Sequence, residues 1–208
     1  MTNPAYMIVG VNIHDADSFR RYAQGAMPLL PRLGATILSG SDDVRGLRGD
    51  WVPDRLVVLK FGSMKDAHGF WNAPHYAPFK ALRESCSDAD ILLVDEADEY
   101  RATEPDSGGS PYYLLGFSDM LNTDWGAEYQ AGTTPIAARY GLTAVCRSDQ
   151  FEVLDGSFDR RSMILLEFPS KDAFDGFWND PEYAPLKKLR EDNTEGEQVA
   201  FAAGFAPV

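Results

Sequence analysis

The sequence contains one stretch twice, in nearly the same words. Residues 69–84 read GFWNAPHYAPFKALRE, and residues 176–191 read GFWNDPEYAPLKKLRE. The two copies are 107 positions apart, and the same spacing relates Tyr22 to Tyr129. This period is far above the roughly 20–50 residues of a solenoid unit and matches the size of a small domain. The sequence therefore predicts one domain that has been duplicated and fused.

The start of each copy aligns at a slightly different spacing. Tyr6 and Gly10 match Tyr112 and Gly116 when the offset is 106. We therefore expect one extra residue in the second copy, before Tyr129.

The composition places a boundary between the copies. We expect a first domain at residues 1–95, a linker at residues 96–110 and a second domain at residues 111–208. The linker reads EADEYRATEPDSGGS, which is acidic and ends in Ser-Gly-Gly-Ser. Such a composition is typical of a solvated, flexible connection.

The chain is strongly acidic, with 32 Asp and Glu against 19 Lys and Arg and a net charge of −13. Nucleic acids and anionic membranes repel such a protein, so we expect neither as a partner. Nor does any run reach the ~18 apolar residues of a membrane span. The two cysteines, Cys86 and Cys146, fall at non-equivalent positions of the repeat. This indicates free thiols in a reducing compartment, and hence a cytoplasmic location.

Each copy has the element order β-α-β-β-α-β, which predicts an α+β fold. The expected strands are runs rich in β-branched and aromatic residues. They cover residues 5–13, 35–40, 55–61 and 91–96 in the first copy, and 111–118, 142–147, 162–168 and 198–204 in the second. Two helical segments connect them in each copy, and the repeated stretch lies in the second of these.

These motifs resemble the DUF1330 domain family, which belongs to the dimeric α/β barrel superfamily. The resemblance rests on the Gly49-Asp50-Trp51 turn, the Trp71-Asn72-x-Pro74-x-Tyr76 motif and Leu82-Arg83. It implies two tandem ferredoxin-like lobes that pack sheet to sheet as an intramolecular dimeric α/β barrel. The chain would then be a pseudo-dimer, and whether it dimerises again stays open.

The resemblance has one departure that concerns charge. The family usually has an acidic residue before the turn glycine. The second copy keeps Asp155 there, whereas the first copy has Arg48.

All three histidines, His14, His68 and His75, lie in the first copy. Histidine is the side chain best suited to proton transfer near neutral pH. We expect the first and third strands to run parallel, so that His14 and His68 share one rim, with Tyr22 as a third catalytic candidate. Alternatively, these histidines are ordinary solvated surface residues. In the second copy, Met120 is the expected counterpart of His14.

Repeated aromatic and charged residues are the candidates for a binding pocket, because pockets combine apolar walls with a few polar groups. Packing between helix and sheet explains the same aromatic residues equally well, and the arginine of the motif can pair with a neighbouring acid instead of a substrate. The substrate-binding candidates are Trp51, Trp71, His75, Tyr76, Arg83, Tyr129, Glu167, Trp178 and Tyr183.

Two classes of function fit these features. The superfamily resemblance implies a cofactor-independent enzyme that acts on a small hydrophobic, aromatic or polyketide-like molecule by acid–base chemistry. Cyclases, isomerases, lyases and cofactor-free monooxygenases are of this type. The alternative is a non-catalytic ligand-binding or stress-associated protein. The sequence has no glycine-rich phosphate loop, G-x-S-x-G elbow or zinc signature, which argues against nucleotide chemistry and serine hydrolysis. The resemblance implies chemistry without a cofactor. We expect no metal either, since His14, His68 and the nearby aspartates form no compact ligand motif.

Overall fold

The computed structural model describes residues 3–95, 110–202 and 204–205. The predicted linker lies outside these residues, except for Ser110. We call residues 3–95 the first lobe and residues 110–205 the second lobe.

The predicted element order is present in both lobes, with one additional short strand in the first lobe (β3) and two in the second (β8 and β11). The first lobe contains β1 (Ala5–Ile13), α1 (Ala16–Ala26), α2 (Leu29–Arg32), β2 (Thr36–Ser41), β3 (Val44–Arg48), β4 (Arg55–Phe61), α3 (Met64–Trp71), α4 (Ala77–Glu84) and β5 (Ser87–Asp95). The second contains β6 (Tyr112–Met120), α5 (Gly126–Arg139), β7 (Thr143–Ser148), β8 (Phe151–Asp155), β9 (Ser162–Phe168), α6 (Lys171–Trp178), α7 (Tyr183–Asn193), β10 (Thr194–Ala202) and β11 (Gly204–Phe205).

Local signals place the helix ends. The Asp15 carboxylate accepts hydrogen bonds from the backbone N–H groups of Asp17 and Ser18 and so caps α1. Pro28, which has no backbone N–H to donate, lies between α1 and the short α2. Its counterpart Pro135, in contrast, lies inside the continuous α5.

The strands form two sheets, and each lobe gives strands to the sheet of the other: β3 from the first lobe, and β8 and the two-residue β11 from the second. The first sheet has the order β11-β2-β4-β1-β5-β8, and the second has the order β3-β10-β6-β9-β7. Strand β3 of the first lobe pairs with β10, while β8 of the second lobe pairs with β5. This reciprocal exchange ties the lobes together and carries the end of each exchanged strand toward the opposite lobe.

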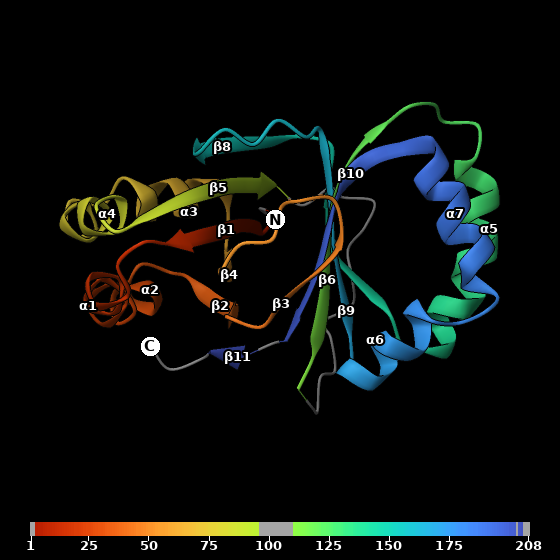
Figure 1. Cartoon of the computed structure of the whole chain (residues 1–208). Helices are drawn as coiled ribbons and strands as arrows, with labels where there is room; N and C mark the ends of the chain where they lie inside the picture. Colours follow the sequence, from red (N-terminus) through yellow and green to blue (C-terminus); the bar gives the residue numbers. More distant parts are fainter. Residues whose placement is uncertain (1–2, 96–109, 203, 206–208) are drawn as a thin grey trace.

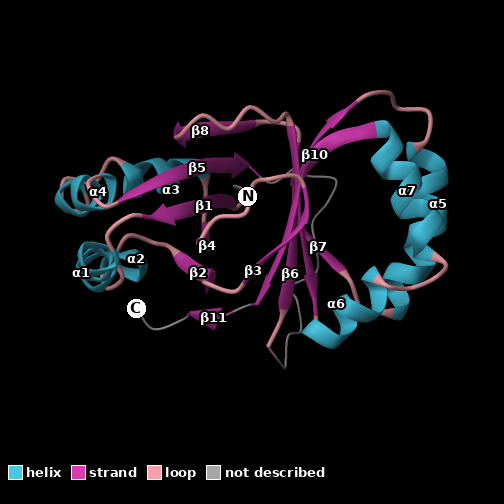
Figure 2. Cartoon of the chain, viewed as in Figure 1, coloured by secondary structure: helices cyan, strands magenta, loops and turns pink. Residues whose placement is uncertain are grey.

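The layers follow the predicted barrel. The two sheets face each other in the middle of the molecule, and the helices cover their outer faces, α1–α4 on one side and α5–α7 on the other (Figures 1 and 2). Apolar residues from both sheets form a shared core, including Tyr6 and Ile8 from β1 and Leu115 and Phe117 from β6. In each lobe a further core lies between the sheet and the helices that cover it. In the described residues, no helix is long and apolar enough to cross a membrane.

The strand register corrects the alignment of the two copies. In the first lobe Ala5 pairs with Phe61, and in the second Tyr112 pairs with Phe168. Both pairs differ by 107, so this offset also holds at the first strand. The extra residue expected before Tyr129 is therefore wrong.

A backbone contact beyond the first strand gives the same result. The N–H of His14 donates to the carbonyl of Cys86, and the N–H of Leu121 donates to the carbonyl of Asn193. The counterpart of His14 is thus Leu121 and not Met120. A one-residue shift matters in a strand because it moves every side chain to the other face.

Candidate functional site

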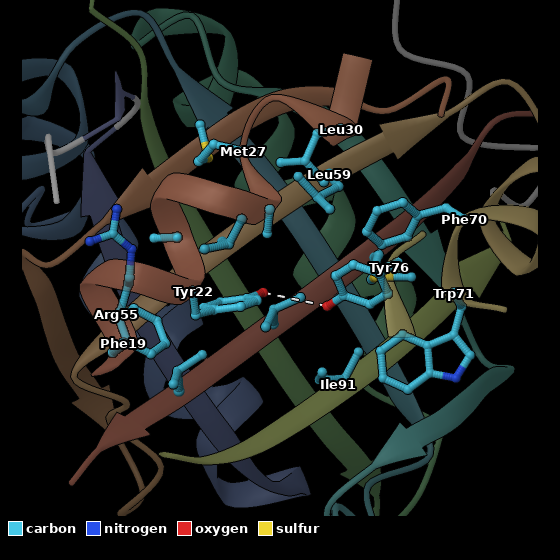
Figure 3. A pocket seen from close by; sticks show the side chains of 16 residues that line it. Phe19, Tyr22, Met27, Leu30, Arg55, Leu59, Phe70, Trp71, Tyr76 and Ile91 are labelled. Atoms are coloured by element: carbon cyan, nitrogen blue, oxygen red, sulfur yellow. Dashed lines mark hydrogen bonds between the residues drawn. The ribbon is translucent and has the colours of Figure 1, made fainter. Parts of the chain in front are cut away.

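Each lobe has a cavity between its helices and the outer face of its sheet. The first cavity has a volume of about 60 Å³. Its walls are almost entirely apolar. The hydroxyls of Tyr22 and Tyr76 point toward each other, with Phe19 beside Tyr22 and Phe70 beside Tyr76 (Figure 3). Little room is left for a ligand.

The second cavity occupies the equivalent place and has a volume of about 430 Å³. Its walls come from α5, α7 and the second sheet, and they include Trp125, Tyr129, Phe177 and Tyr183. The exposed Met120 lies at its edge, where the cavity meets solvent. A volume of this size lies within the range of small-molecule sites, roughly 300–1,000 Å³.

Substitutions at equivalent positions explain why only one cavity is open. Phe19 of the first lobe corresponds to Gly126, and Val9 corresponds to Gly116. A Cβ atom at Gly126 would meet no atom within 4 Å. Three further exchanges remove bulk or add polarity: Val11 to Ser118, Leu30 to Ala137 and Ile91 to Gln198.

A pair of tyrosines lies at the same place in both cavities. The hydroxyl groups of Tyr22 and Tyr76 are 3.4 Å apart, and those of Tyr129 and Tyr183 are 3.3 Å apart. Burial is the main cause that raises the pKa of Tyr22 and of Tyr183 above the ordinary tyrosine value. Both buried phenols therefore stay protonated near neutral pH and can act as hydrogen-bond donors.

A buried arginine stands behind each tyrosine pair, and in the first lobe its charge is matched. Arg83 is 1% exposed. Its Nη2 is 2.5 Å from a carboxylate oxygen of Asp155, at the end of the exchanged strand β8, and 3.5 Å from Glu84. The prediction that this arginine could pair with a neighbouring acid is thus met by Glu84, and more closely by Asp155.

In the second lobe the corresponding arginine lacks such a strong partner. Arg190 donates from Nη1 to the Tyr183 hydroxyl at 2.9 Å, and from Nη2 to Gln198 at 3.0 Å and to Glu191 at 3.3 Å. Its Nε is buried and has no hydrogen-bond partner, as is also the case for Arg83 Nε. Where Asp155 stands in the first lobe, the exchanged strand β3 brings Arg48.

The second cavity is consequently positive in an acidic protein. Arg48, Arg147 and Arg190 line it, and no Asp or Glu is among the described residues that do. Arg48 donates to the hydroxyl of Thr194 at 2.8 Å and to the carbonyl of Glu191 at 3.2 Å, both neutral acceptors. The arrangement can hold a small organic molecule and offers it both hydrogen-bond donors and positive charge.

The structure does not bring the predicted histidines together. Strands β1 and β4 pair antiparallel, so their C-terminal ends lie at opposite ends of the sheet, and the expected shared rim is wrong. The exposed His14 is 2.8 Å from Asp88, while His68 on α3 is 3.2 Å from Glu152. His75 is exposed between α3 and α4. A proton-transfer role for any one of them stays a prediction.

Several predicted binding residues lie outside the cavities. Trp51 belongs to the core between the sheets, where it packs against Phe117 and donates from Nε1 to Asp90 at 2.9 Å. Glu167 is 5% exposed, and burial raises its pKa although Tyr113 donates a hydrogen bond to it. Glu167 stands on the same face of β9 as the core residues Met163 and Leu165.

The repeated tryptophans differ from each other. Trp71 lines the first cavity and is only half-buried, with the Lys80 ammonium 3.8 Å from its ring centre. Trp178 is 8% exposed and packs against Phe174 in the core of the second lobe, and it is not among the residues that line the cavity.

The residues that make the second cavity distinctive were not among the predicted site residues. They are Arg48, Gly116, Ser118, Gly126, Thr133, Arg147 and Gln198. The sequence carried one usable signal, the charge reversal between Arg48 and Asp155. No candidate metal centre with three or more His, Cys, Asp or Glu side chains occurs in the described part of the chain.

Similar folds occur in solved structures at low sequence identity. A chlorite dismutase variant from Candidatus Nitrospira defluvii has a TM-score of 0.62 at 12% identity, with 98% of this chain and 92% of that one covered. A proposed monooxygenase from Lactobacillus acidophilus NCFM has a TM-score of 0.52 at 11% identity, over 97% and 93%. An anthrone oxidase-like protein has a TM-score of 0.54 at 10% identity, over 98% and 91%. At such identities the likeness shows the fold alone.

No curated protein matches the sequence. The sequence profile of the family described as "Domain of unknown function (DUF1330)" matches residues 4–97 and again residues 111–204, which together cover most of the chain. The chain belongs to the DUF1330 family, as a tandem copy of its domain.

Proposed function

We propose that this protein is an enzyme that acts on a small, mostly apolar organic molecule by proton transfer, with the second cavity as its active site. One observation carries the proposal. The second lobe has a cavity of about 430 Å³ at the place that large side chains fill in the first lobe. The tyrosine pair is present at this place in both lobes.

The hydrogen bonds give the tyrosines distinct roles. The Tyr183 oxygen accepts from Arg190, so its own proton is available to the Tyr129 oxygen 3.3 Å away. The O–H of Tyr129 is then left to donate into the cavity. A phenol positioned in this way can hydrogen-bond to a substrate carbonyl oxygen and stabilise the enolate that forms when a neighbouring C–H loses its proton.

The substrate's proton leaves toward solvent in this proposal. No carboxylate or histidine is among the described lining residues, so a base from solvent, hydroxide or a buffer anion, takes the proton. Proton transfer of this kind needs no redox group, which agrees with the predicted cofactor-free chemistry. That prediction, like the role of the histidines, awaits experiment.

Deuterium exchange tests the proposal without knowledge of the natural reaction. Aryl ketones such as 1-tetralone are incubated with the protein in D₂O, and exchange at the carbon next to the carbonyl is followed by NMR. We expect exchange faster than in buffer, and a loss of about 10²–10⁴-fold of the enhancement in Tyr129→Phe. Tyr22→Phe in the first cavity is the matched control and should exchange like the wild type. Equal exchange in Tyr129→Phe and wild type would contradict the proposal.

A non-catalytic binding protein is the second candidate. The lack of a carboxylate or histidine among the described lining residues favours it, because an enzyme of this kind usually places a base beside its substrate. Ligand binding in the second cavity without any exchange above the buffer rate would support this alternative.

A further inference from the structure

We infer that the ligand of the second cavity is an organic anion, a carboxylate on an apolar body, and that Arg190 and Arg48 recognise its charge. The inference rests on the proposed function, since it names the substrate class of the same cavity. It starts from the reciprocal exchange of β3 and β8, which brings opposite charges to two equivalent arginines.

In the first lobe the charge of the buried arginine is balanced by acidic residues of the protein. Arg83, Glu84 and Asp155 form one group there, with Asp155 2.5 Å and Glu84 3.5 Å from the guanidinium. The Arg83 charge is thus balanced within the protein, although its Nε has no hydrogen-bond partner, and the cavity beside it is small.

The second lobe keeps the arginine and the adjacent acid but reverses the third charge. Arg190 and Glu191 repeat Arg83 and Glu84, whereas Arg48 replaces the acid at position 155. Among the described residues, Arg190 forms an ion pair with Glu191 alone, at 3.3 Å on a half-exposed side chain. Arg48 itself donates to neutral oxygens, the Thr194 hydroxyl and the Glu191 backbone carbonyl, and both arginines line the open cavity.

Unused donors also face this cavity. Arg190 Nε and the Thr133 hydroxyl are buried without a hydrogen-bond partner. Arg83 Nε in the first lobe is also unpartnered, whereas Thr133 has the apolar Ala26 as its counterpart, so the hydroxyl is the unused donor specific to the second cavity. Leaving such groups unsatisfied is costly, and a guanidinium is geometrically matched to a carboxylate. The apolar walls, among them Trp125 and Phe177, suit an aromatic or aliphatic body.

Binding of three matched probes tests the inference. We would titrate the protein with 2-naphthoate, 2-naphthamide and 2-naphthylmethylamine and follow binding by calorimetry. We expect naphthoate to bind at least about tenfold more tightly than the amide, and the amine to bind weakest. Added salt should reduce this preference.

Arg48→Asp is the most informative variant, because it rebuilds in the second lobe the charge group that already folds in the first. It should weaken naphthoate binding by about tenfold or more while changing naphthamide binding little. Arg48→Gln removes a positive charge without adding a negative one, so its affinity for naphthoate should lie between those of the wild type and Arg48→Asp. Thermal unfolding establishes that each variant is folded.

The outcomes separate the two proposals. Naphthoate and naphthamide binding equally, with Arg48→Asp without effect, would overturn the anion inference and leave the cavity proposal standing. Gly126→Phe, which copies Phe19 of the first lobe, should abolish binding of all three probes. Unchanged binding in Gly126→Phe, or no naphthoate binding at millimolar concentration, would overturn both.

Discussion

The first and second lobes have the same backbone plan, but the space between helices and sheet is filled in the first lobe and open in the second. In the first lobe Phe19 and Val9 fill the space beside the tyrosine pair, and in the second Gly126 and Gly116 leave it open. Gene duplication allows this division, because one copy can become the packing partner while the other keeps or gains a cavity. The two lobes therefore serve as internal controls for each other.

The exchanged strands make the comparison sharper. Each lobe builds the charge environment of its buried arginine with a residue from the other copy, Asp155 for Arg83 and Arg48 for Arg190. The second cavity is thus a product of both halves of the sequence, and neither domain would form it alone.

The largest expected effect concerns the buried ion pair. Asp155→Ala leaves the guanidinium of Arg83 buried beside a single half-exposed acid, so we expect a loss of about 3–5 kcal/mol in the free energy of unfolding. Arg48→Ala removes hydrogen bonds to neutral acceptors only and should cost clearly less. Urea denaturation of both variants measures the difference. Equal losses would show that the two arginines are in equivalent environments after all.

Replacing the two tryptophans of the repeated motif by alanine should cost different amounts of stability, with the larger loss at the more buried one. Trp178→Ala removes a ring that is 8% exposed and stacked on Phe174, and we expect a cost of about 3–4 kcal/mol. Trp71 is half-buried, so Trp71→Ala should cost less, about 1–2 kcal/mol. Urea midpoints check this order. A larger loss for Trp71→Ala would mean that the two motif copies pack differently from the structure.

Glu167 gives a smaller effect, which depends on pH. Burial raises its pKa above the ordinary value of 4.5, so the folded protein holds this proton more tightly than the unfolded chain. Glu167 therefore lowers stability as pH rises from about 4.5 through its folded pKa. Glu167→Gln removes this loss and should stabilise the protein by about 1 kcal/mol at pH 7.

Thermal unfolding between pH 4 and pH 8 measures that effect. The difference in stability between Glu167→Gln and the wild type should grow as pH rises. Lys60→Gln, at the equivalent position of the first lobe, is the matched control and should not show this trend. A constant difference across the range would contradict the raised pKa.

The repeated, periodic parts of the fold were predictable from the sequence. The runs at residues 5–13, 55–61 and 162–168 are strands with those bounds, because β-branched and aromatic residues dominate them. The sheet-to-sheet packing followed from the family resemblance. The exchanged strands β3 and β8 were missed, since five-residue segments at a turn carry little pattern and their partners lie in the other lobe.

The candidate site was harder to predict for two physical reasons. Identity at Tyr6 and Gly10 favoured an offset of 106, although only 107 keeps the alternation of faces that the register requires. In addition, the second cavity exists because large side chains are absent, and glycines at positions 116 and 126 do not by themselves indicate a binding site. The four tyrosines could be predicted as pocket residues because they are repeated. The prediction that His14 and His68 share a rim was wrong because the strands that precede them, β1 and β4, run antiparallel.

One crystallographic measurement tests the central claim that the second cavity is the ligand site and the first is only packing. Crystals soaked in 6-bromo-2-naphthoate would report the probe through the anomalous signal of bromine. We predict one strong peak between α5, α7 and the second sheet, with the carboxylate beside Arg190 and Arg48. A peak of equal or greater height between Tyr22 and Trp71 in the first lobe, or no peak in the second cavity, would contradict the account.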